Sequence, residues 1–150
     1  MANTLPLLAA VAIGACLSLQ PPINAVLART VGSALLASTI SIAISLALVL
    51  AIWLVWGRGT GDLGQVGALP WWIVLGGVFG VVFVAGSIVV APVTGVALFF
   101  VCVVAGQLVG ATVVDHYGSF GVSIRPVGTA KVLGLALVLA GAALVRWGDR

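Results

Sequence analysis

Residues 31–56 read VGSALLASTISIAISLALVLAIWLVW and contain no charged side chain. A helix of about 20 apolar residues is long enough to cross the roughly 30 Å hydrocarbon core of a bilayer. Four other stretches are similarly apolar, so the five expected helices cover about 4–28, 31–56, 70–90, 93–114 and 127–145. These runs lack the alternation of apolar and polar residues that is typical of a β-barrel strand. We therefore predict an all-α membrane protein in which residues 1–150 form a single transmembrane domain.

Hydrophobic residues make up 63% of the chain and charged residues only 6%. Water-soluble domains carry about 25% charged residues, so this composition excludes that class. The six Lys and Arg residues are scattered singly, which predicts a lipid bilayer as the partner and no nucleic acid. The single His and the two Cys suggest no catalytic triad and no metal cluster, and the chain has no phosphate-binding loop. We therefore expect neither enzymatic activity nor a bound metal or cofactor.

The cationic residues are divided evenly between the two ends of the predicted helices. One side of a five-helix chain carries Arg58, Arg125 and Lys131, and the other side carries Arg29, Arg146 and Arg150. The excess of Lys and Arg in cytoplasmic loops normally sets the orientation of a membrane protein. Because the count is three against three, we predict that the chain inserts in both orientations. Two oppositely inserted copies would form an inverted homodimer, with its axis in the membrane plane.

The segment Gln20-Pro21-Pro22-Ile23-Asn24 is the strongest candidate for function. Two successive prolines remove two backbone donors and clash with carbonyls four residues earlier, so we expect the first helix to kink or unwind there. A second break is expected at Pro92, between the third and fourth helices. Gln20 and Asn24 lie one turn apart on one helix face, which predicts a substrate-binding pair in a water-lined cavity. The alternative is a structural kink whose amides bind neighbouring helices.

Other polar residues are weaker candidates. Gln107 lies inside the fourth helix and is expected to point inward, either to bind substrate or to join two helices. Ser18 and Thr94 are possible substrate contacts, although their hydroxyls can bond to their own helix. Asp115 and His116 lie where the fourth helix ends, as anchoring residues or as a proton or gating pair.

Several glycines have the small-xxx-small spacing that lets membrane helices approach closely. The expected packing positions are Gly76, Gly77, Gly80, Gly106 and Gly110. The sequence does not indicate which helix these glycines meet.

An ordered set of short motifs resembles the YdcZ-like proteins of the drug/metabolite transporter superfamily. The motifs are Gln20-x-x-Ile23-Asn24-Ala25-x-Leu27, Trp72-x-x-x-Gly76-Gly77-x-x-Gly80, Pro92-x-x-Gly95-x-Ala97, Gly106-Gln107-Leu108, Asp115-x-Tyr117-Gly118 and Arg125-Pro126. The family consists of five-helix bacterial inner-membrane proteins described as exporters. The resemblance implies a half-sized transporter that works as an antiparallel dimer, built from one dual-topology chain or from two related chains.

We therefore predict a transporter of a small metabolite or drug that acts by alternating access as an inverted dimer in the bacterial inner membrane. Gln20, Asn24 and Gln107 are expected to line a cavity between the two copies, where the small-molecule substrate binds near the midplane. A dual-topology ion channel and a structural or accessory membrane subunit are the alternatives.

Overall fold

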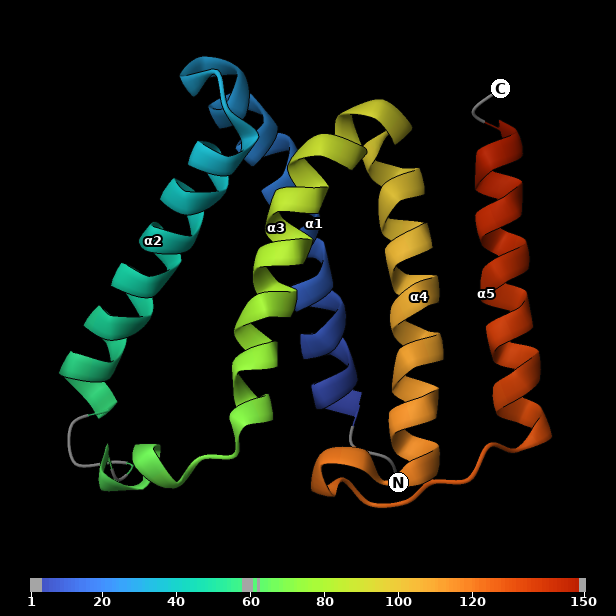
Figure 1. The fold of residues 1–150 in the computed structure, drawn as a ribbon. Helices are drawn as coiled ribbons and strands as arrows, with labels where there is room; N and C mark the ends of the chain where they lie inside the picture. The colour runs from blue at the N-terminus through green and yellow to red at the C-terminus, as the bar shows by residue number, and fades with distance from the viewer. Residues whose placement is uncertain (1–3, 58–60, 62, 149–150) are drawn as a thin grey trace. The chain divides into compact units, whose positions relative to one another are not determined.

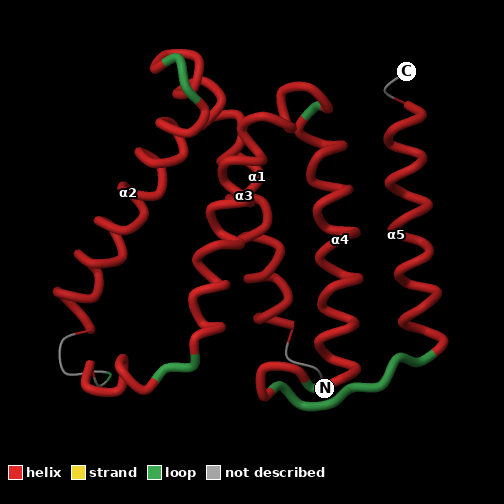
Figure 2. Tube along the Cα trace, in the orientation of Figure 1, coloured by secondary structure: helices red, strands yellow, loops and turns green. Residues whose placement is uncertain are grey.

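The computed structural model describes residues 4–57, 61 and 63–148 of the 150-residue chain. Five long helices are present: α1 (Thr4–Val31), α2 (Ala34–Ile52), α3 (Val74–Thr94), α4 (Val96–Tyr117) and α5 (Thr129–Gly148) (Figure 1). The shorter helical segments are η1 (Trp53–Gly57), η2 (Leu63–Ala68), η3 (Trp71–Ile73) and η4 (Ser119–Gly121). Within these described residues no strand is found (Figure 2). The predicted all-α fold with five helices is therefore confirmed.

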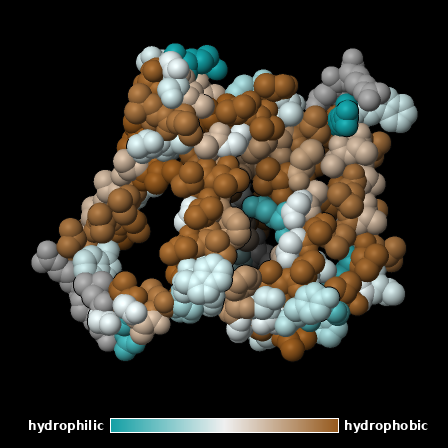
Figure 3. Space-filling model, viewed as in Figure 1, coloured by the Kyte–Doolittle hydropathy of each residue, from teal (hydrophilic) through white to brown (hydrophobic). Residues whose placement is uncertain are grey.

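All five helical spans are long and apolar enough to cross a membrane, at 20 to 24 residues each. Their outward side chains are mostly aliphatic or aromatic, and apolar residues cover most of the visible surface (Figure 3). Such a surface would be unfavourable in water but matches the hydrocarbon of a bilayer.

The helices continue past the prolines at which the sequence predicts breaks. α1 stays helical through Pro21 and Pro22, so the predicted unwinding is wrong, while a kink there stays a prediction. α3 likewise continues through Pro92 to Thr94, so the predicted break at Pro92 is wrong. A helix can continue past a proline because the ring removes only one backbone hydrogen bond. The hydrogen bonds of the neighbouring turns still hold the helix together.

The helical run is interrupted instead at Gly95, which separates α3 from α4 and has φ +82° and ψ 147°. This region of backbone conformation is essentially restricted to glycine, because a Cβ clashes with the adjacent backbone. The position of the break is therefore determined by the residue that permits a positive φ.

Substituting Gly95 with alanine should lower the free energy of unfolding by about 1 to 3 kcal/mol, the cost of holding a Cβ in this conformation. Gly86→Ala is the matched control, because Gly86 lies within α3 and an added Cβ would meet nothing within 4 Å. The control should leave stability unchanged or raise it by up to about 1 kcal/mol. Unfolding in detergent measures both variants. Equal stability of Gly95→Ala and the parent chain would contradict this role.

The structure divides into two compact units, a first unit comprising Met1–Pro92 and a second unit comprising Val93–Arg150. In the first unit, α1 and α2 form an antiparallel hairpin joined by Gly32, at φ +72°, and Ser33. The Ser33 hydroxyl caps α2 by accepting a hydrogen bond from the backbone N–H of Leu36 at 3.2 Å. The buried side chains of Ala37, Val84 and Ile88 form the core of this unit.

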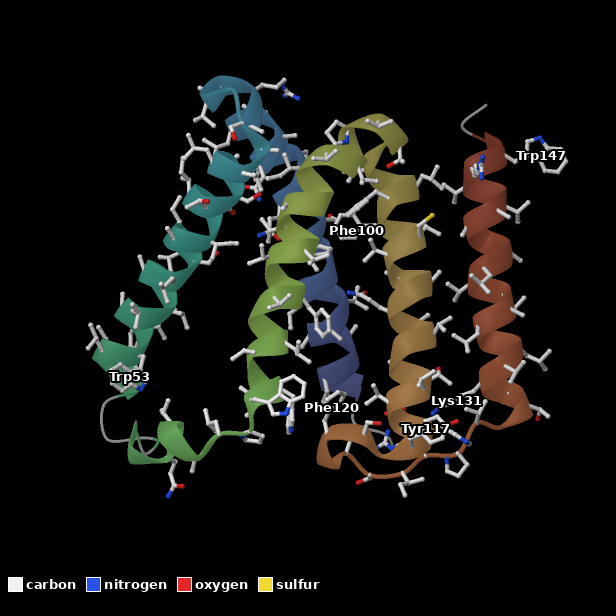
Figure 4. The ribbon with its side chains drawn as sticks, viewed as in Figure 1. Trp53, Phe100, Tyr117, Phe120, Lys131 and Trp147 are labelled. Atoms are coloured by element: carbon white, nitrogen blue, oxygen red, sulfur yellow. The ribbon has the colours of Figure 1, made fainter. Side chains whose placement is uncertain are left out.

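The second unit is an antiparallel pair of helices, α4 and α5, joined by residues 118–128. On α5, a stripe with helical spacing is half-buried and is made of Leu135, Val138, Ala142 and Val145. Tyr117 and Lys131 mark one end of the pair and Trp147 marks the other (Figure 4). Aromatic and cationic side chains at the two ends of an apolar helix pair are typical of the two membrane interfaces.

Candidate solute-binding site

An open cavity of about 440 Å³ lies between α1 and α2 in the first unit. Leu19, Ile23 and Ile44 on its wall are each more than half exposed. Nine described residues line it: Cys16, Leu19, Gln20, Ile23, Asn24 and Leu27 from α1, and Ser41, Ile44 and Ser45 from α2. The spacings of three and four residues place each set on one face of its helix. Since a helix rises about 1.5 Å per residue, Cys16 and Leu27 lie roughly 22 Å and 6 Å along α1 from its end at Val31. The lining residues of α1 therefore span about 16 Å along the helix, roughly half of the 30 Å hydrocarbon core.

Asn24 is the buried polar residue in this cavity, with only 4% of its surface exposed. Its side-chain nitrogen Nδ2 has no hydrogen-bond partner in the described structure. Two other buried polar residues of the first unit differ in this respect. The hydroxyl of Ser38 donates to the carbonyl of Ala34 at 2.8 Å, and that of Ser87 donates to the carbonyl of Val84 at 2.8 Å. Asn24 is thus buried with an unused donor, whereas these serines are satisfied by their own helices.

An unused buried donor is unfavourable by about 1 to 3 kcal/mol relative to a satisfied one, so native proteins contain few. A group that carries this penalty in a cavity large enough for a small molecule is a candidate ligand contact. Asn24 therefore stays the predicted solute contact, with Nδ2 as its unpaired donor.

Gln20 lies one turn before Asn24 and is half-buried at the same cavity. On α2, the hydroxyl of Ser45 donates to the carbonyl of Ser41 at 3.0 Å, which leaves the Ser45 oxygen as an acceptor only. The polar lining therefore combines amide donors and acceptors on α1 with hydroxyl groups on α2. None of the nine described lining residues is charged.

The structure brings together two of the predicted substrate contacts, Gln20 and Asn24. Ser18 does not line the cavity and donates to the carbonyl of Ala15 at 2.7 Å. Thr94 donates to the carbonyl of Gly95 at 3.2 Å, outside the cavity. Gln107 belongs to α4 of the second unit, where its side chain is exposed.

Sequence reasoning missed the contributions of Cys16, Ser41 and Ser45. Cys16 lies one turn before Gln20 on the same face of α1, and Ser41 and Ser45 are one turn apart on α2. The helical spacing of these small polar residues in an otherwise apolar stretch was the sequence feature that could have indicated their place in the site. This spacing does not reveal that these faces of α1 and α2 lie opposite one another, because that depends on tertiary packing.

The predicted packing glycines have open surroundings within the described chain. A Cβ added at Gly76, Gly77, Gly80, Gly106 or Gly110 would meet nothing within 4 Å. Close packing at these glycines therefore stays a prediction.

Asp115 and His116 hold the loop that joins α4 to α5. The Asp115 carboxylate accepts from Nζ of Lys131 at 3.2 Å, and its backbone carbonyl accepts from the N–H of Arg125 at 2.8 Å. His116 accepts through Nδ1 from the N–H of Val127 at 3.3 Å. Because the side chains of the ion pair are 38% and 36% exposed, it stabilises the fold by at most about 1 kcal/mol. These contacts anchor the loop, and a proton or gating role stays a prediction.

Comparison with known proteins was made over the whole chain. Residues 5–144 match a protein family described as "Putative inner membrane exporter, YdcZ". The inner membrane protein YdcZ of Escherichia coli strain K12 is 30% identical over 147 residues, which cover 97% of each chain. No solved structure matches the chain. The family match and the five apolar helices locate the chain in the inner membrane as a multi-pass protein. The chain belongs to the YdcZ family of inner membrane proteins, which is described as a family of exporters.

Proposed function

We propose that this protein transports a small molecule across the inner membrane by alternating access, as an inverted dimer of two copies. The observation that carries the proposal is the cavity between α1 and α2, in which Asn24 is buried with an unused donor. Membership of an exporter family supports transport at a general level and points away from an enzyme.

The balance of cationic residues supports the inverted dimer. Arg125 and Lys131 lie toward one end of the helix pair of the second unit, and Arg146 lies in the last turn of α5 at the other. In the first unit, Arg29 lies in the last turn of α1. Arg58 and Arg150, which with Arg29 complete the count of three against three, lie outside the described residues. With no excess on either side, the cationic residues favour neither orientation.

The exposed amide of Gln107 supports a partner surface over α4. Gln107 is the twelfth of the 22 residues of α4, so it lies near the middle of a membrane-spanning helix. A polar side chain at that depth is unfavourable against lipid and normally contacts protein or a water-filled cavity. We infer that in the dimer Gln107 contacts the second copy or the transported solute.

In the proposed cycle, the solute enters the cavity from one side and accepts a hydrogen bond from Asn24, with Gln20 as a second polar contact. Rocking of the two copies against one another would then close the first opening and expose the solute to the opposite side. The neutral lining would let the solute leave again, since no fixed charge retains it.

Uptake by inverted membrane vesicles tests the proposal. Vesicles with and without the protein are incubated with a defined mixture of metabolites, and their contents are then identified by mass spectrometry. We expect at least one metabolite to accumulate only in vesicles that contain the protein. Unitary currents in a planar bilayer would instead favour an ion channel. Absence of flux together with constant co-purification of a larger membrane protein would favour an accessory subunit.

A further inference from the structure

The donor chemistry of Asn24 limits what the cavity can bind. A carboxamide nitrogen donates hydrogen bonds and accepts none. With 4% of Asn24 exposed and no acceptor for Nδ2 in the described structure, the missing partner is an atom with a free lone pair. Carbonyl, amide, ether and hydroxyl oxygens all meet this requirement.

The lining of the cavity disfavours a charged solute. The nine described lining residues include no carboxylate to pair with a cation and no Lys, Arg or His to pair with an anion. Arg29, the next cationic residue along α1, is exposed and does not line this cavity. A charged solute would lose its hydration without gaining an opposite charge, which is strongly unfavourable at hydrocarbon depth.

The remaining wall of the cavity is apolar. Leu19, Ile23, Leu27 and Ile44 present aliphatic side chains, and Cys16 adds a small thiol. A volume of about 440 Å³ lies in the lower half of the range of small-molecule pockets, which is roughly 300 to 1,000 Å³. The cavity therefore matches the size of a small metabolite with an apolar group.

From these three features we propose that the cavity selects uncharged amphipathic solutes, whose carbonyl-type oxygen accepts a hydrogen bond from Nδ2 of Asn24. Amino acids and short peptides that are blocked at both ends belong to this chemical class. The inference rests on the proposed function, because it assigns the class of the transported substrate to the same cavity.

Binding of three matched probes to the full-length protein in lipid nanodiscs tests the selectivity. N-acetyl-leucinamide is neutral, N-acetyl-leucine is an anion, and leucinamide is a cation in a mildly acidic buffer. Calorimetric titration should show that the neutral probe binds at least about tenfold more tightly than either charged probe. Equal or tighter binding of a charged probe, or no binding of the neutral probe, would overturn the proposal.

The variant Asn24→Leu should weaken binding of the neutral probe by about tenfold or more, since it removes the donor and keeps the branched shape of the side chain. Ser38→Ala is the matched control, because Ser38 is as buried as Asn24 but its hydroxyl is satisfied by Ala34. Full binding by a folded Asn24→Leu would overturn the assignment. If that variant does not fold, Asn24→Ser retains a shorter donor and should bind the neutral probe more weakly than the parent chain; unchanged binding would again contradict it.

The binding experiment tests the selectivity and the uptake experiment tests transport, so one proposal can be contradicted without the other. Accumulation of a charged metabolite in the vesicles would contradict the selectivity and would still support transport. Tight binding of the neutral probe by a protein that moves no solute would support the selectivity and contradict the proposed transport.

Discussion

Replacing Asn24 with leucine should abolish most transport while making the empty protein more stable. The substitution removes a buried donor without a partner, which costs about 1 to 3 kcal/mol in the parent chain, and replaces it with an apolar side chain of the same branched shape. The same change removes the hydrogen bond to the solute, so uptake at low solute concentration should fall by about tenfold or more. Vesicle uptake and unfolding in detergent measure the two effects on the same variant.

Ser38→Ala provides the comparison for this prediction. Ser38 has the same exposed fraction as Asn24, 4%, but its hydroxyl already donates to the carbonyl of Ala34. Transport should be unchanged and stability should change by no more than about 1 kcal/mol. Normal uptake by Asn24→Leu would exclude Asn24 from the solute pathway. A loss of stability in Asn24→Leu would mean that Nδ2 has a partner in the membrane-embedded protein.

Biasing the orientation of the chain should eliminate transport, and mixing two oppositely biased chains should restore it. Gln65→Arg combined with Ser123→Arg raises one side from three cationic residues to five, against three on the other. Arg125→Gln combined with Lys131→Gln lowers that same side to one, against three. Because the side with more Lys and Arg stays in the cytoplasm, the two variants should insert in opposite senses.

Each biased variant alone cannot form an inverted dimer, so its uptake should fall at least about tenfold, to that of vesicles without the protein. Co-expression supplies both orientations and should recover transport. Labelling of engineered cysteines from each side of the membrane verifies the orientation of each variant. Normal transport by a chain that is shown to insert in one sense would contradict the inverted dimer.

The helical architecture was predictable because charge-free stretches of about 20 residues have few structural solutions in lipid. The ends of the helices were less predictable. Proline is a common helix breaker, yet α3 continues through Pro92 to Thr94. The helical run is interrupted at Gly95, because only glycine readily adopts the backbone conformation found there. Local composition thus identified the break to within a few residues, while the backbone geometry selected the position.

Only those site residues that stand out within the sequence of a single helix could be predicted. Gln20 and Asn24 are amides beside two prolines, and both line the cavity. Ser41 and Ser45 become part of the site only because α2 packs against α1. Gln107 was expected to point inward and is exposed, since a single chain lacks the surface that we propose covers it.

The thiol of Cys16 provides the most direct test that the cavity around Asn24 is the solute pathway. Cys16 lines the cavity, and Cys102→Ala would leave it as the single cysteine of the chain. In membranes containing this single-cysteine protein, N-ethylmaleimide should modify Cys16, because a water-accessible thiol can ionise and react. A neutral solute that occupies the cavity, such as N-acetyl-leucinamide, should slow the modification in a concentration-dependent manner. A Cys16 that stays unmodified in the folded protein, or reacts at the same rate with and without solute, would contradict the account.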